Sequence, residues 1–94
     1  MNEKVKYWLD LSDYDYTTAV AMQQSGRYLY VGFMCHQTIE KILKAYFNLN
    51  NSEPDIEARY FSHKEKLMKG LTKERCEEIL KNTKELQSWI KTKL

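Results

Sequence analysis

Apolar residues recur every three or four positions along three stretches of the chain, which is the spacing of one face of an α-helix. These stretches cover about residues 3–24, 27–48 and 72–93. Ser25-Gly26 separates the first two, and glycine readily takes the left-handed conformation that ends a helix. So short a turn makes the two helices antiparallel neighbours. No stretch alternates with the period of a strand, so we predict an all-α fold.

The pattern weakens between residues 48 and 70. Ser52 is a candidate N-cap and Pro54 suits the first turn that would follow, so we predict a loop that holds a short helical turn. Thr72 is the predicted N-cap of the last helix, with Glu74 in its first turn. The predicted architecture is an up-and-down helical bundle of three main helices plus this short turn, forming one domain over residues 1–94.

Size and charge narrow the class of protein. A chain of 94 residues buries only about 60–65% of its unfolded surface, so we expect it to form a homodimer. Residues 1–58 hold five Lys or Arg against eight Asp or Glu, whereas residues 59–94 hold ten against five. The basic and acidic residues interleave at helical spacing, so charge alone does not indicate a nucleic-acid-binding domain.

No run of 18 apolar residues could span a membrane, and residues 1–4 lack the apolar core of a signal peptide. We therefore expect a cytoplasmic protein without a membrane partner. Cys35 and Cys76 lie 41 residues apart, have no companion ligands at metal-binding spacing, and fall on apolar helix faces. We expect buried thiols, with no disulfide, metal or cofactor.

A polar stripe lies within the apolar second helix. Gln37, Glu40, Lys41 and Lys44 occupy successive turns of one helical face. Glu40 and Lys44 form an i,i+4 pair worth only about 0.2–0.5 kcal/mol. The stripe is either a solvated face or a surface that binds a ligand or partner.

Asp15 is a carboxylate inside the apolar stripe of the first helix. An unpaired buried carboxylate is costly, so we expect Asp15 to pair with Lys41 or Arg59 in the bundle; the alternative is a role at a ligand site. His36 is expected to be a packing or surface residue, and His63 an exposed loop residue.

The combined motifs resemble the HEPN family, the higher eukaryote and prokaryote nucleotide-binding domains. The family pattern has Trp-Leu and Asp-hydrophobic-x-x-Ala on its first helix, Gln-x-x-Glu-Lys-x-x-Lys on its second, and Arg-Tyr before its last. This chain matches it at Trp8-Leu9, Asp15-Tyr16, Ala19, Gln37, Glu40-Lys41, Lys44 and Arg59-Tyr60. Typical members carry one more helix after the second, so the domain is expected to be about one helix shorter.

The resemblance implies a nucleotide- or substrate-binding accessory subunit that partners a small nucleotidyltransferase, commonly in a toxin–antitoxin module, and that need not itself catalyse a reaction. Its ligand- or partner-binding residues would be Gln37, Glu40, Lys41, Lys44, Arg59 and Tyr60.

Two alternatives remain at this point. One is a metal-independent RNase toxin with Arg59 and His63 as the catalytic pair. The nuclease branch places four to six residues between Arg and His, and three stand here. We therefore expect the two side chains not to approach one phosphate together. The other alternative is a helical interaction domain without a ligand.

Overall fold

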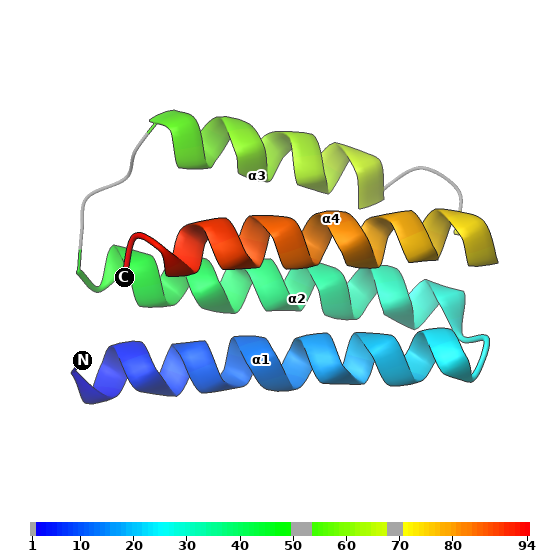
Figure 1. Ribbon diagram of the computed structural model, residues 1–94, viewed down its shortest axis with the longest axis horizontal. Coiled ribbons are helices and arrows are strands. Elements are labelled where there is room, and N and C mark those ends of the chain that lie inside the picture. The colour runs from blue at the N-terminus through cyan, green and yellow to red at the C-terminus, as the bar shows by residue number, and fades with distance from the viewer. Residues whose placement is uncertain (1, 50–53, 68–70) are drawn as a thin grey trace.

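The computed structural model describes residues 2–49, 54–67 and 71–94, and within residues 54–67 the side chains of Ile56 and residues 59–64. It contains four helices: α1 (Glu3–Gln24), α2 (Tyr28–Phe47), α3 (Pro54–Leu67) and α4 (Lys73–Lys91). They run alternately in opposite directions, and both chain ends lie at the same end of the bundle (Figure 1). The all-α, up-and-down prediction is confirmed.

The helix ends follow local chemistry. Asn2 Oδ1 accepts a hydrogen bond from the Val5 amide at 2.8 Å, and Thr72 Oγ1 accepts one from the Arg75 amide at 3.1 Å. Gly26 has φ +74°, the left-handed conformation that the turn between α1 and α2 requires. The Thr72 cap and the Gly26 turn were both predicted from the sequence, and both are confirmed.

The third helix differs from the prediction. α3 has 14 residues, which is about four turns, instead of a single short turn. Ser52, the expected cap, lies outside the described residues. Sequence periodicity gave a weak signal here because α3 contributes few residues to the core: among its described side chains only Ile56 and His63 are buried.

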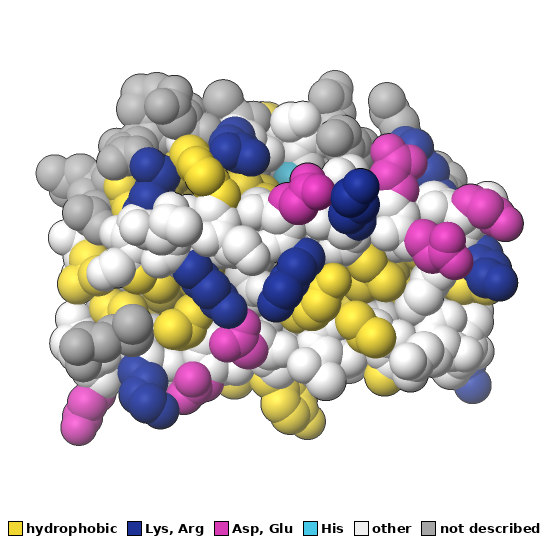
Figure 2. Space-filling view, viewed as in Figure 1, with side chains coloured by type: hydrophobic (Ala, Val, Ile, Leu, Met, Phe, Trp, Pro, Cys, Tyr) yellow, Lys and Arg dark blue, Asp and Glu magenta, His cyan; other side chains and the backbone are white. Residues whose placement is uncertain are grey.

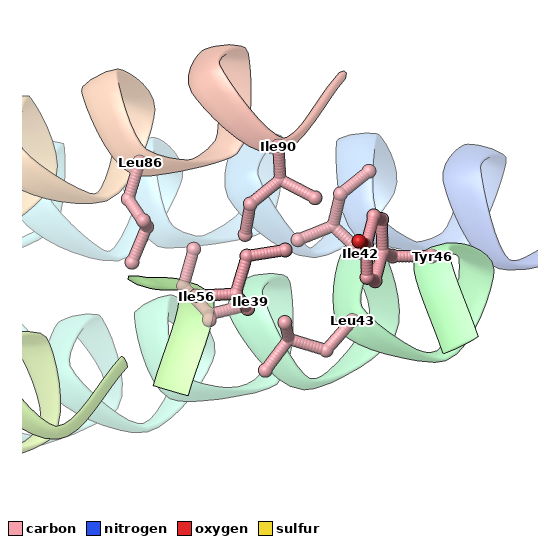
Figure 3. Close-up of a cluster of buried hydrophobic side chains, with 7 residues drawn as sticks. All are labelled: Ile39, Ile42, Leu43, Tyr46, Ile56, Leu86 and Ile90. Carbon is pink, nitrogen blue, oxygen red and sulfur yellow. The ribbon is translucent and has the colours of Figure 1, made fainter. Parts of the chain in front are cut away.

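The bundle has two hydrophobic clusters. Figure 3 shows one of them, where Ile56 of α3 meets side chains of α2 and α4. The other joins α1, α2 and α4 and contains both cysteines, which are fully buried and free, as predicted. The first cluster consists of Ile39, Ile42, Leu43, Tyr46, Ile56, Leu86 and Ile90.

A buried polar network crosses the three main helices. The fully buried Gln87 of α4 donates from Nε2 to Ser12 Oγ at 2.9 Å and to Asp13 Oδ1 at 3.0 Å. Ser12 Oγ in turn donates to the backbone oxygen of Thr38 at 2.7 Å. Because each unsatisfied buried polar group is costly, this network fixes the register of α1 against α2 and α4.

Candidate functional site: the groove between α2 and α3

The polar stripe of α2 does not form one continuous surface. Lys41 faces α1, where its Nζ donates to Asp15 Oδ2 at 2.9 Å and to Gln37 Oε1 at 3.2 Å. The Asp15 side chain is 11% exposed and that of Lys41 is 20% exposed. Lys41 is one of the two partners anticipated for Asp15. Because its charge is matched within the bundle, Lys41 has little capacity left for a ligand.

Glu40 faces α3 instead. The Tyr60 hydroxyl donates to Glu40 Oε1, and His36 Nε2 lies 3.6 Å from the same oxygen. Burial, together with the Glu40 carboxylate, raises the pKa of Tyr60 to about 12. The phenol therefore stays protonated and keeps donating at neutral pH, which ties α3 to α2.

Glu40 and Tyr60 border a groove of about 380 Å³ between α2 and α3. Its walls are largely apolar, and its polar groups come from two charged residues and one tyrosine. A hollow of this size lies within the range of small-molecule sites in proteins. The lining residues are Glu40, Leu43, Lys44, Phe47, Ile56 and Tyr60.

Lys44 is the exposed cation of this groove. Its Nζ lies 4.6 Å from the centroid of the Trp8 ring. An exposed cation–π contact is worth only about 0.5–1 kcal/mol, so an anion in the groove can recruit the ammonium from Trp8. Three of the six residues predicted for the site, Glu40, Lys44 and Tyr60, therefore meet at one hollow.

Arg59 lies on the opposite side of α3, toward α4. Its guanidinium stacks on the Trp89 ring at 4.1 Å from the ring centroid. It also borders a smaller hollow of about 160 Å³, lined by Arg59, Ser62, His63, Asn82, Glu85 and Leu86. Arg59 and Tyr60 are therefore adjacent in sequence but serve different hollows.

The expectation of an exposed His63 is wrong. His63 lies within α3 and is only 5% exposed, and its Nε2 forms a hydrogen bond with Thr83 Oγ1 at 2.6 Å. Arg59 and His63 are four residues apart on α3, so they share a face and both border the smaller hollow. That they do not approach one phosphate together stays a prediction.

In the described part of the chain, neither the cysteine thiols nor a metal-binding cluster provides catalytic groups. Burial raises the pKa of the Cys35 thiol to about 11 and also raises that of Cys76, so neither thiol is a ready nucleophile. Among the described residues, no group of three or more His, Cys, Asp or Glu could hold a metal ion.

Both signs of charge interleave over α4 in Figure 2, without a broad basic patch. Nor does any helix in the described ranges have the length and hydrophobicity to cross a bilayer.

Sequence reasoning missed three contributors to this region. Leu43 and Phe47 of α2 and Ile56 of α3 line the groove, and the sequence pattern marked them only as apolar residues. Leu43 and Phe47 are four residues apart on the flank of α2 that also carries Glu40, a signal that could have indicated a mixed apolar and polar surface.

Comparison with known proteins agrees with the motif pattern. No curated protein and no solved structure gives a significant match. The family model described as the HEPN domain matches residues 5–56, more than half of the chain, and its match covers α1, α2 and the start of α3. The chain therefore belongs to the HEPN domain family.

Proposed function

We propose that this chain is a nucleotide- or substrate-binding accessory subunit whose ligand occupies the groove between α2 and α3. The observation that carries the proposal is the groove itself, which brings apolar walls, an aromatic ring and a cation together in about 380 Å³. Phe47 and Ile56 offer surfaces for a base, and Lys44 offers a charge for a phosphate. Membership of the HEPN family supports a nucleotide as the ligand.

The test is calorimetric titration of the purified protein with the four ribonucleoside 5′-monophosphates. Lys44→Glu is expected to weaken binding by about 10- to 100-fold, because a hydrogen bond to a charged group contributes about 1.5–3 kcal/mol. Lys81→Glu is the matched control, since Lys81 is an exposed lysine of α4 away from the groove. Equal losses in both variants would indicate a general charge effect and refute the assignment.

A second pair of variants tests the apolar wall. Phe47 is 44% exposed and lines the groove, whereas Phe61 is 71% exposed and does not line it. Phe47→Ala is expected to weaken nucleotide binding, and Phe61→Ala to leave it unchanged. If Phe61→Ala weakens nucleotide binding and Phe47→Ala does not, the ligand binds elsewhere on α3.

The proposal includes a protein partner. The family resemblance supports a small nucleotidyltransferase encoded beside this chain, with the pair acting as a cytoplasmic toxin–antitoxin module. Co-expression of the two neighbouring genes, followed by purification through a tag on this chain, tests the pairing. Recovery of a stoichiometric complex would support it, and failure of two well-folded products to associate would remove it.

Self-association is also part of the proposal. Tyr7 and Tyr14 are 57% and 72% exposed and lie two turns apart on one face of α1, a placement typical of an interface. Light scattering at micromolar concentration should give the mass of a homodimer, and Tyr14→Glu should reduce it to that of a monomer. A monomer in the unmodified protein would contradict this element.

One observation favours a second candidate function, the metal-independent RNase. Arg59 and His63 line one hollow together with the carboxylate of Glu85, so a phosphate-binding cation and two acid–base groups are close together. The deep burial of His63 and its bond to Thr83 weigh against this function. We expect no RNA cleavage in EDTA; cleavage that His63→Ala abolishes would establish the nuclease instead.

A further inference from the structure

A separate hollow lies between α1 and α2 beside their connecting turn. Its volume is about 340 Å³, and it shares no lining residue with the groove between α2 and α3. Its lining residues are Thr18, Met22, Arg27, Tyr30 and Met34.

The methionine side chains in the walls of this hollow can adapt to apolar ligands of different shapes. Met22 and Met34 enter it from opposite helices, and methionine adapts its unbranched side chain to irregular partners. The apolar surface extends beyond the hollow, because Leu29 and Phe33 are 69% and 55% exposed on the same half of α2.

The hollow carries positive charge. Arg27 is the one charged residue in its lining, and in the part of the chain that the structure describes no carboxylate lies within 4.0 Å of its guanidinium. Arg27 is also the N-cap of α2, whose first turn has neither a side-chain cap nor an acidic residue. The partial positive charge of the helix N-terminus therefore adds to that of Arg27.

We propose that this hollow binds a small organic carboxylate with an apolar body. The carboxylate pairs with the Arg27 guanidinium in the planar, two-bond geometry that this side chain favours, and the apolar body lies between Met22 and Met34. A free phosphate would leave the methionine walls without a partner. A neutral hydrophobe would gain nothing from the exposed Arg27 guanidinium.

The experiment uses the full chain with ¹³C-labelled methionine methyl groups and three probes of equal chain length: octanoate, octanol and octylamine. Octanoate should shift the methyl signals of Met22 and Met34, and should bind about tenfold more tightly than octanol. Arg27→Gln should reduce octanoate binding to the level of octanol. Arg75→Gln is the matched control, because Arg75 lies in α4 and pairs with Glu78.

Three outcomes would overturn the proposal. Equal affinity for octanoate and octanol would show that the charge plays no part. Undiminished octanoate binding in Arg27→Gln would place the carboxylate elsewhere. If the Met22 and Met34 signals depend on protein concentration and no probe shifts them, a second copy of this chain covers the hollow.

Discussion

The ion pair between Asp15 and Lys41 offers a quantitative test of the packing of α1 against α2. Asp15→Ala leaves the Lys41 ammonium, 20% exposed, with only the Gln37 amide oxygen at 3.2 Å. Breaking a fully buried pair costs about 3–5 kcal/mol, and an exposed pair contributes about 0–1 kcal/mol. Because both side chains retain some exposure, we expect a loss of about 2–3 kcal/mol in the free energy of unfolding.

The assay is urea unfolding followed by circular dichroism, with thermal unfolding as a second measure. A loss of 2–3 kcal/mol corresponds to a decrease in Tm of about 8–20 °C for a domain of this size. The matched control is Asp10→Ala, which removes the exposed pair of Asp10 with Lys6 at 3.0 Å, where the side chains are 62% and 70% exposed. That variant should unfold within about 0.5 kcal/mol of the parent.

The double variant Asp15→Leu with Lys41→Met separates the two sources of the loss. Replacing both charges with apolar side chains of similar volume removes the stranded cation, so stability should recover most of the way to the parent. If Asp15→Ala unfolds within about 0.5 kcal/mol of the parent, the pair is effectively solvated and our account of the α1 and α2 interface is refuted.

Three further predictions concern the remaining helices. Because the pKa of Tyr60 is raised from 10.0 to about 12, its stabilising effect should be complete below pH 10 and lost as the pH rises toward 12; Tyr60→Phe should remove this dependence in unfolding measured between pH 9 and 12. Thr83→Val removes the hydroxyl that bonds His63 Nε2 and should lower stability by about 1–3 kcal/mol in urea unfolding; no loss would contradict a buried bond between the two side chains. Thr72→Ala removes the cap of α4 and should lower stability by about 1 kcal/mol, whereas Thr72→Ser should be neutral; equal losses would contradict the cap.

The sequence predicted the three main helices because each buries a continuous stripe of apolar residues. That stripe alone determines which face of the helix points into the bundle. It did not predict the length of α3, whose described side chains include only two buried residues, Ile56 and His63. Whether a weakly amphipathic segment is helical depends on packing with distant residues, such as the cluster that Ile56 shares with Leu86 and Ile90.

Three residues that border the groove, Glu40, Lys44 and Tyr60, were candidates from the sequence, but their grouping apart from Lys41 and Arg59 was not predicted. Helical spacing puts Glu40, Lys41 and Lys44 at neighbouring positions of α2, and the structure divides them between the side toward α1 and the side toward α3. The spacing does not say which neighbouring helix each one meets, because that depends on the angular positions of α1 and α3 around α2. Lys41 is neutralised by Asp15, while Glu40 is engaged by Tyr60 across the groove.

The central claim is that a nucleotide binds between α2 and α3, and backbone amide NMR during titration with a nucleoside monophosphate tests it most directly. The claim predicts saturable shifts centred on Glu40, Lys44, Phe47 and Tyr60, with Asn82 and Met22 unaffected. Shifts centred on Asn82 and Glu85, or no saturable shift at millimolar nucleotide, would contradict it.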